Sequence, residues 1–321
     1  MSTGRELHLD TPLTNFAVQA FQSMQDYVAP LIVPVVPVGK QSDKYYVLDR
    51  DAWLRTPSST LRAPKTPPKR VEWKASSDSY FANNYALAND ISKEDLANSD
   101  MALMVRERGA EFVTEMLVRD YEQRIATLFT TFGNFNAYTS LSAAADKWTA
   151  TGSADIRSQV TSAHARVRNQ TGVRANTLIV DFDSYQLMAQ NSRLLTNFQY
   201  TEVPGHLTEQ QMRSVLEVER IIVGKAIRNT AGETAGTSVF SSTNVWGANA
   251  VLCYLAPATT LKAMTFAASF RWTPPGLPGA FQVYRYDDPD PGKKAEVVEV
   301  GYYQDEKIIA PDLGFLIANT R

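Results

Sequence analysis

The sequence predicts an α+β protein, and three observations lead to that fold class. A single long helical segment covers residues 91–132. Helices alternate with short apolar strands between about residues 155 and 257, and the chain beyond residue 281 consists of strands joined by turn-rich segments. With 321 residues, 44% of them hydrophobic, the chain can bury a substantial core in one large or two ordinary domains.

Composition excludes several classes of protein. A net charge of -2 and a pI near 6.0 argue against a dedicated nucleic-acid binder, which normally carries a basic surface. The single cysteine, Cys253, excludes an internal disulfide framework. No charged segment followed by an apolar run opens the chain, so we expect no secretory signal. The most apolar run, residues 28–38, is too short to span a bilayer, and we expect a soluble protein.

The N-terminal part is predicted to form a helix and then an arm. Apolar residues spaced from Phe16 to Tyr27 indicate a short amphipathic helix over residues 14–27, which Pro30 ends. Residues 28–38 (VAPLIVPVVPV) indicate extended chain, because a residue that precedes proline disfavours helix. This apolar arm has no core of its own, so it must pack on its own body or on another subunit.

A long loop follows, enclosed by predicted strands at residues 45–48, 71–74 and 80–87. It contains four prolines and five basic residues between positions 55 and 70: Arg55, Arg62, Lys65, Lys69 and Arg70. A loop of this length is uncommon in a compact domain and is usually functional or a linker. It is either a surface excursion or an arm that reaches a neighbouring molecule.

The long helix carries its own start signal. Ser92 and Asp95 have the spacing of a capping box, and Ile91 with Leu96 that of a hydrophobic staple. Its apolar stripe recurs at three- and four-residue steps: Val113, Leu117, Tyr121, Ile125, Leu128 and Phe132. Its solvated face is predicted to carry the ion pairs Glu115–Arg119 and Asp120–Arg124. Residues 98–100 and Gly109 are the positions where the helix is weakest.

The remaining elements follow from the same patterns. Residues 133–152 and 231–242 are loop-like. Helices are expected at 155–170, ended by Gly172, and at 183–190 and 207–217. Strands are expected at 177–180, 219–226, 250–255, 281–286, 295–303 and 308–317.

No constellation of residues indicates catalysis. The three histidines have no metal-ligand spacing, and Cys253 lies in an apolar strand where a packed, inert thiol is the better interpretation. Asp181 and Asp183 follow a strand, where α/β enzymes carry catalytic acids, but a cap on the next helix explains Asp183 better. There is no glycine-rich phosphate loop and no nucleophile elbow. We therefore predict no catalytic, cofactor or metal residues and a protein that is not an enzyme.

The order of these parts resembles the major capsid proteins of tailed phages, which have the Hong-Kong-97-type fold. The resemblance covers nearly the whole chain: the arm at 28–38, the Tyr45–Tyr46 strand that opens the long loop, ISKEDLANSD before the long helix, and the closing VEVGYYQDEKIIAPDLGFLIA. It implies an N-terminal arm (1–39) and an extended β-hairpin loop, the E-loop (40–91). It further implies a β-rich peripheral domain with the spine helix (92–154 and 258–321) and a mixed α/β axial domain (155–257).

The resemblance also implies a function. Pentamers and hexamers of the chain would form an icosahedral head shell around double-stranded DNA, in the virion capsid, after assembly in the cytoplasm of the bacterial host. The implied partners are a portal, a separate scaffolding protein, in some members a decoration protein, and packaged DNA held without sequence preference, with no membrane. Lys65 and Lys69 lie in the loop through which some members form a Lys–Asn cross-link, but no acceptor asparagine can be matched here.

Two alternatives stay open. A cellular nanocompartment of the encapsulin type shares this fold and encloses a protein cargo, and an α/β enzyme is a more distant possibility. For the shell, we predict that the basic loop of one subunit lies over an acidic strip of its neighbour. That strip contains Asp287, Asp288 and Asp290. The competing interpretations are a loop that touches nothing and a loop whose charge faces DNA.

Overall fold

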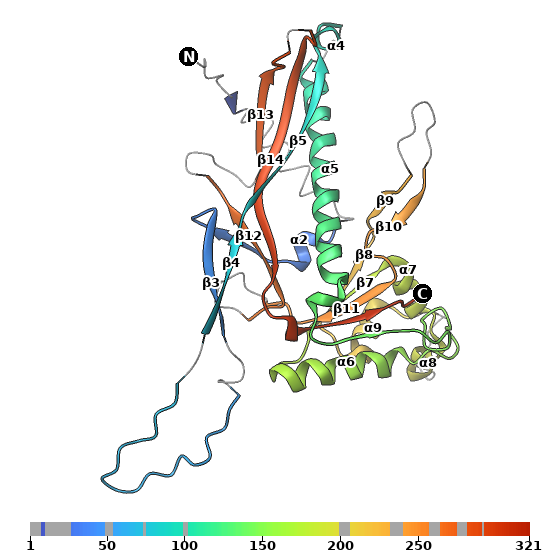
Figure 1. Ribbon diagram of the computed structural model, residues 1–321. Coiled ribbons are helices and arrows are strands. Elements are labelled where there is room, and N and C mark those ends of the chain that lie inside the picture. Colours follow the sequence, from blue (N-terminus) through green and yellow to red (C-terminus); the bar gives the residue numbers. More distant parts are fainter. Residues whose placement is uncertain are drawn as a thin grey trace.

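Helix α5 (Ala102–Thr130) runs beside the long strands of one β-sheet and ends against a second sheet (Figure 1). The computed structural model describes residues 8–9, 27–48, 54–72, 75–98, 102–198, 206–231, 240–256, 264–274, 281–290 and 292–321. Apart from Tyr27, the helix predicted over residues 14–27 lies outside these ranges.

The predicted long helix is confirmed over the described residues. Helix α4 (Lys93–Asn98) precedes α5, and residues 99–101, which include most of the weak point predicted at 98–100, lie outside the described residues. The central residues of the predicted stripe are at most 2% exposed: Val113, Leu117, Tyr121 and Ile125. Phe132 is 43% exposed and lies beyond α5 in the 3-10 turn Phe132–Asn134. The Ser92 hydroxyl accepts from the Glu94 amide (3.1 Å), one residue earlier than the predicted capping box requires.

The first sheet has six strands, in the order β1 (His8–Leu9), β13 (Gln282–Asp287), β14 (Ala295–Ile308), β12 (Ala267–Trp272) and β2 (Val35–Val38), with β5 (Asn83–Ser92) also paired to β14. Only the β12–β2 pair is parallel. The 14-residue strand β14 pairs with β5 over ten residues, with β13 along its first half and with β12 toward its end. Helix α5 packs against β14 and β5 through a core that contains Leu117, Val298 and Tyr302.

The second sheet has five strands, in the order β6 (Tyr138–Ser140), β15 (Gly314–Ala318), β11 (Asn249–Cys253), β7 (Thr177–Asp181) and β8 (Arg220–Gly224). Helices α6 (Ile156–Thr171), α7 (Phe182–Ala189), α8 (Ser192–Leu195) and α9 (Glu209–Leu216) accompany this sheet. Asp155 caps α6 through the Ser158 amide (3.0 Å), and Gly172 ends the helix in the left-handed conformation, as predicted. One core lies between the sheet and these helices, and another between the sheet and α5.

Two hairpins project from this body (Figure 1). Strands β3 (Ser42–Leu48) and β4 (Ala75–Phe81) form the stem of the long loop, whose residues 54–72 have no regular secondary structure. Strands β9 (Ile227–Asn229) and β10 (Ser242–Asn244) form a second hairpin where the sequence analysis expected the end of a strand and a loop. The strand predicted at 71–74 is wrong for Val71 and Glu72, which are exposed and outside any strand.

Three further expectations are corrected. The arm is not extended throughout: Ala29–Ile32 form the single turn α2, and Pro30 is tolerated there because the first turn needs no N–H from it. Asp183 does not cap α7; Asp181 holds the cap position and Asp183 lies in the first turn. The strand predicted at 308–317 is the end of β14, the 3-10 turn Pro311–Leu313 and β15.

Candidate assembly surfaces

The predicted basic loop is a fully exposed arm. Residues 54–72 are all exposed, including Arg55, Arg62, Lys65, Lys69 and Arg70. The Thr66 amide and hydroxyl donate to the Ala63 carbonyl oxygen, and the Arg62 guanidinium donates to the Thr66 carbonyl oxygen. These hydrogen bonds all join residues that are close in sequence. No ion pair joins these five cations to an acid among the described residues. Apart from Leu54, which lies near Gly172 at the end of α6, the described contacts of the loop are local.

The predicted acidic strip lies at the other end of the molecule, at the turn between β13 and β14 beside α4 (Figure 1). Asp287 pairs with Lys93 (2.9 Å) and Asp288 with Lys293 (3.5 Å). Asp290 accepts from the Gly292 amide within its own turn (2.9 Å). The structure does not bring the two predicted surfaces together within one subunit, and two of the three acids already have a cation partner.

The N-terminal arm is anchored on its own subunit by a buried carboxylate. Glu122 of α5 is fully buried and accepts from the Ala29 amide (2.6 Å) and from the indole N–H of Trp246 (2.6 Å). Ile32 and Val33 are also fully buried, in the core between α5 and the second sheet. Of the two possibilities for the apolar arm, this stretch packs on its own body.

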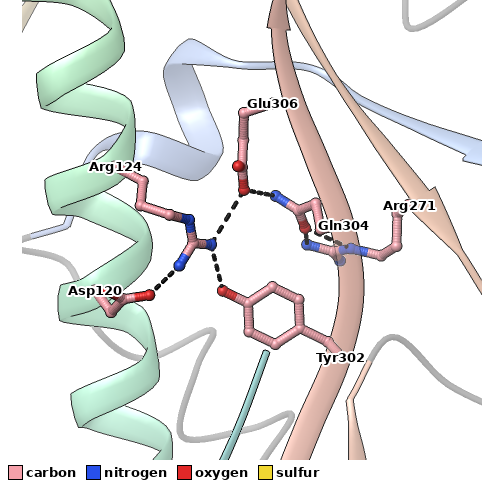
Figure 2. Close-up of polar contacts among 6 residues, drawn as sticks. All are labelled: Asp120, Arg124, Arg271, Tyr302, Gln304 and Glu306. Carbon is pink, nitrogen blue, oxygen red and sulfur yellow. Dashed lines mark hydrogen bonds and ion pairs between the residues drawn. The ribbon is translucent and has the colours of Figure 1, made fainter. Parts of the chain in front are cut away.

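A second polar cluster joins α5 to the first sheet (Figure 2). Arg124 pairs with Asp120 one turn back, donates to the Tyr302 hydroxyl (2.8 Å), and pairs with Glu306 (3.1 Å). Its guanidinium also lies 3.7 Å from the centre of the Tyr85 ring on β5. Gln304 donates to Glu306 and accepts from Arg271 of β12, at 3.0 and 2.7 Å. The cluster thus connects α5, β5, β14 and β12.

This cluster corrects the predicted solvated face of α5. The ion pair Asp120–Arg124 forms as expected, but the Arg124 side chain is only 21% exposed and points toward the sheet. Burial raises the pKa of Tyr302 to about 12, and Arg124 acts in the opposite direction. Burial alone would lower the pKa of Arg124, yet Tyr302 and Glu306 hold it above its usual value, so the guanidinium stays charged. The other predicted pair, Glu115–Arg119, forms on a more exposed part of the helix.

A third cluster fixes the end of the described chain. Arg321 contacts Asp181 (2.8 Å) and Asp183, and Asn244 donates to Asp183 (2.9 Å). Asp181 is fully buried, and burial raises the pKa of its carboxyl group. Arg321 and Asn244 contact the carboxylates of Asp181 and Asp183. These two aspartates therefore have a structural role at the base of the β9–β10 hairpin.

The side chains that could have carried chemistry are packed in the core. Cys253 is fully buried, and burial raises the pKa of its thiol, as expected for an inert packed cysteine. His164 is buried with Nε2 3.1 Å from the Leu216 carbonyl oxygen. The described residues contain no group of three His, Cys, Asp or Glu side chains arranged to bind a metal ion. In the same part of the chain, no helix is both long and apolar enough to cross a membrane.

Comparison with known proteins gives this architecture a context. No family model matches the chain. The chain is 26% identical to the major capsid protein of Pseudomonas phage JBD67, over 97% of its own length and 96% of that protein. It is 25% identical to the major capsid protein of Burkholderia phage BcepMu, over 77% and 76% of the two chains. The chain is a homologue of phage major capsid proteins.

Solved structures agree with that relationship at the level of the fold. A phage-related protein from Bordetella bronchiseptica RB50 superimposes with a TM-score of 0.74 at 18% identity, covering 98% of this chain and 99% of that one. The capsid of Cyanophage P-SCSP1u has a TM-score of 0.58 at 10% identity, over 90% and 86% of the two chains. The virus-like particle from Pyrococcus furiosus has a TM-score of 0.53 at 12% identity, over 95% and 97%.

The capsid homologue therefore has the predicted Hong-Kong-97-type fold, and the comparisons support a phage head-shell protein. Relatives of this kind imply self-assembly into an oligomeric shell and a place in the virion capsid, and they are structural proteins rather than enzymes.

Sequence reasoning missed the residues that hold the subunit together. Glu122 lies one residue from the predicted stripe, and Arg124 has an acid four residues before it, so both fit a solvated helix face. Their true partners, Trp246 and Glu306, lie more than 120 residues further along the chain. A helix that packs on two sheets buries a wider part of its surface than one apolar stripe. The polar residues on both sides of the stripe, Glu122 and Arg124 among them, are therefore buried as well.

Proposed function

We propose that copies of this chain form the icosahedral head shell of a tailed phage, as pentamers and hexamers around double-stranded DNA. The observation that carries the proposal is the likeness to a phage major capsid protein over 97% of the chain. A separate scaffolding protein, a portal and a decoration protein are the partners proposed with it, and assembly takes place in the cytoplasm of the bacterial host.

The shape of the subunit supports this role. The β3–β4 stem packs on the first sheet through Tyr45 and Tyr80, which contact Phe270. The loop beyond this stem and the β9–β10 hairpin leave the body, so they gain order where a neighbour receives them. Many weak contacts of this kind, repeated over every subunit, stabilise a closed shell without any single strong interface. The near-neutral net charge of -2 suits a container that surrounds DNA of any sequence without gripping it.

The domain division stays part of the proposal, with two refinements. The proposed parts are the arm (1–39), the E-loop (40–91), the peripheral domain (92–154 and 258–321) and the axial domain (155–257). Strand β15 pairs with β11 and β6, so residues 314–318 go with the axial sheet. Strand β5 pairs with β14 over ten residues, so residues 83–91 go with the peripheral sheet.

The basic loop is proposed to lie on a neighbouring subunit. All five of its cations are exposed, and prolines keep the loop extended, which lowers the entropy lost when it is ordered. The acidic turn with Asp287, Asp288 and Asp290 remains the proposed counterpart. Because Lys93 and Lys293 already neutralise two of these acids, each added pair should contribute at the low end of the usual range of about 0–1 kcal/mol.

A specific observation favours one alternative. The likeness to the virus-like particle from Pyrococcus furiosus covers 95% of the chain, so a cellular compartment with a protein cargo is the second candidate. Its TM-score of 0.53 is below the 0.74 of the phage-related protein from Bordetella bronchiseptica, and the curated relatives come from phages.

Electron microscopy of the expressed chain tests both candidates. With its scaffolding partner, the chain should form capsomer rings or hollow particles, and particles from infected cells should contain double-stranded DNA. Particles that co-purify with one protein cargo in place of DNA would favour the compartment. A stable monomer over a wide concentration range, with the scaffolding partner present, would contradict both.

A further inference from the structure

The exposed face of α5 carries an apolar ridge. Met104, Phe112 and Met116 are 47%, 55% and 42% exposed. Because they are separated by multiples of four residues, their side chains form one row along the helix. The side of α5 that packs on the first sheet, with Val113 and Leu117, is a different one. Apolar side chains gathered in one exposed row, rather than scattered singly, indicate a surface that another segment covers.

The described N-terminal arm begins beside this ridge. Burial raises the pKa of the Tyr27 hydroxyl, and the charge of Arg119 and a hydrogen bond with its side chain act in the opposite direction. The hydroxyl therefore lies at Arg119, which follows Met116 by three residues and so by about one turn of helix. Two residues after Tyr27, the Ala29 amide donates to Glu122 (2.6 Å). The chain is thus fixed on α5 within about one turn of the ridge.

The chain before the arm is fixed at a second point. Leu9 of β1 pairs with Tyr284 of β13, which pairs in turn with Glu299 of β14. The two strand neighbours of Glu299 pack in one core with Leu117 of α5. Leu9 therefore lies at the level of the apolar half of α5. Residues 10–26, which lie outside the described residues, connect these two points.

The sequence of this connection is complementary to the ridge. Phe16, Ala20 and Met24 recur every four residues, and Tyr27 follows three residues later. In the helix that the sequence predicts over residues 14–27, these side chains lie on one face. Since Tyr27 belongs to that face and is fixed on α5, the rest of the face is directed toward α5 as well.

The direction of the segment along α5 follows from polarity. On one side of Arg119 the ridge continues with Met116 and Phe112, and on the other side the exposed positions are polar: Asp120, Gln123 and Thr127. An apolar face is stabilised only on the apolar side. One turn back from Tyr27, Met24 would then meet Met116, and one turn further the apolar residues at positions 20 and 21 would meet Phe112.

We propose that the apolar face of residues 14–26 docks on the Phe112–Met116 ridge of its own subunit. Because Tyr27 is already bound to α5, this docking is intramolecular, and the high effective concentration of the tethered segment favours it over the same segment of another copy. The contact belongs to the single subunit. It goes beyond the proposed shell function and does not depend on it.

Engineered cysteines test the contact in the unassembled full-length chain. Met24→Cys with Met116→Cys, oxidised under mild conditions, should form an intrachain disulfide that changes gel mobility and leaves the chain monomeric. The native Cys253 is fully buried and does not compete. The matched control is Met24→Cys with Gln123→Cys, an exposed position about one turn from Arg119 on the polar side, which should give little of this product.

Each other outcome of the oxidation overturns the inference. No disulfide from the first pair, or equal yields from the two pairs, would show that the segment does not lie on the ridge. Covalent dimers or larger oligomers in place of the intrachain product would show that the ridge receives the segment of a second copy. All of these results leave the proposed shell function standing, because they concern the subunit before assembly.

Limited proteolysis provides an independent readout. Chymotrypsin cleaves after Phe21 only when the segment is undocked, and the cleavage rate then follows the population of the undocked form. Phe112→Ser should raise the initial rate roughly tenfold or more, because the apolar contact is lost. Leu31→Ser, at a position that is 67% exposed on α2, is the matched control and should leave the rate unchanged. Equal rates for the wild type and Phe112→Ser, or an equal increase for Leu31→Ser, would overturn the proposed docking.

Discussion

At the scale of single residues, Glu122 joins three parts of the chain that are distant in sequence. It lies on α5, accepts from the arm at Ala29, and accepts from Trp246 beside the second sheet. Burial raises the pKa of its carboxyl group, although the hydrogen bonds from Trp246 and Ala29 act in the opposite direction. In the folded subunit the carboxyl group therefore binds a proton more readily than in the unfolded chain, where its pKa is about 4.3.

The first prediction is a pH dependence that Glu122→Gln removes. A raised carboxyl pKa contributes stability that is fully present below the unfolded pKa and is lost as pH rises through the folded pKa. The unfolding free energy of the wild-type subunit should therefore fall relative to the variant as pH rises above about 4. Denaturant titrations at several pH values measure this difference, with Glu111→Gln, exposed on the same helix, as the control for losing a carboxylate. A difference that does not change with pH would contradict the prediction.

The second prediction concerns the packing of α5. Leu117 is 2% exposed against β14 and β5, so Leu117→Ala should destabilise the unassembled subunit by about 2–5 kcal/mol. Glu111→Ala, at an exposed position of the same helix, should stay within about 0.5 kcal/mol. Chemical denaturation measures both, and equal losses would show that the buried face of α5 is assigned incorrectly.

At the scale of elements, glycines let aromatic rings lie flat on the second sheet. A Cβ atom at Gly224 of β8 would lie 2.2 Å from the Trp246 ring, and one at Gly314 of β15 would lie 2.3 Å from the Phe266 ring. The Trp246 ring cannot move away freely, because Glu122 holds its indole N–H. These strands therefore need glycine for packing, although glycine in a strand usually weakens it.

The third prediction follows from that contact. Gly224→Ala should cost about 1–3 kcal/mol through overpacking and should change tryptophan fluorescence, because the Trp246 ring must shift. Gly133→Ala is the matched control, since nothing lies within 4 Å of the added Cβ atom there. An unchanged denaturation midpoint and spectrum for Gly224→Ala would show that the ring has room to adjust.

Elements with a local signal could be predicted from the sequence. The periodicity of α5, the Asp155 cap and Gly172 end of α6, and the apolar runs of β7 and β11 all depend on near neighbours in the chain. Strand β12 and the β9–β10 hairpin were missed, because β12 is defined by pairing with β14 and β2 and the hairpin is short and polar. The hydrogen-bond partners of Glu122 and Arg124 depend on the same long-range pairing. The five basic residues of the loop are exposed, and the surface proposed to receive them belongs to another copy of the chain, which the sequence of one subunit does not locate.

At the scale of the whole molecule, charge is placed unevenly. The loop at residues 54–72 carries five exposed cations and one acid, Glu72, and lies at the opposite end of the subunit from the acidic turn (Figure 1). Its cations contact no acid among the described residues, so their removal should leave the subunit itself unaffected. In a shell, the small electrostatic contribution of these cations would be repeated at every contact between neighbouring subunits. The sum of these contributions to the stability of the shell is then large.

The last prediction applies that argument to assembly. Arg62→Glu with Lys65→Glu and Lys69→Glu should leave the melting temperature of the unassembled subunit nearly unchanged, because exposed pairs contribute about 0–1 kcal/mol each at most. The same variant should reduce particle yield or shell heat-stability, and wild-type particles should weaken in high salt, since exposed charges are screened over about 10 Å at 0.1 M. Arg166→Glu with Arg168→Glu, exposed on α6, controls for four of the six units by which the triple variant changes the net charge. Light scattering and thermal melts of assembled particles measure both effects. If the triple variant assembles with the yield, melting and salt response of the wild type, the loop does not join neighbouring subunits through its charges.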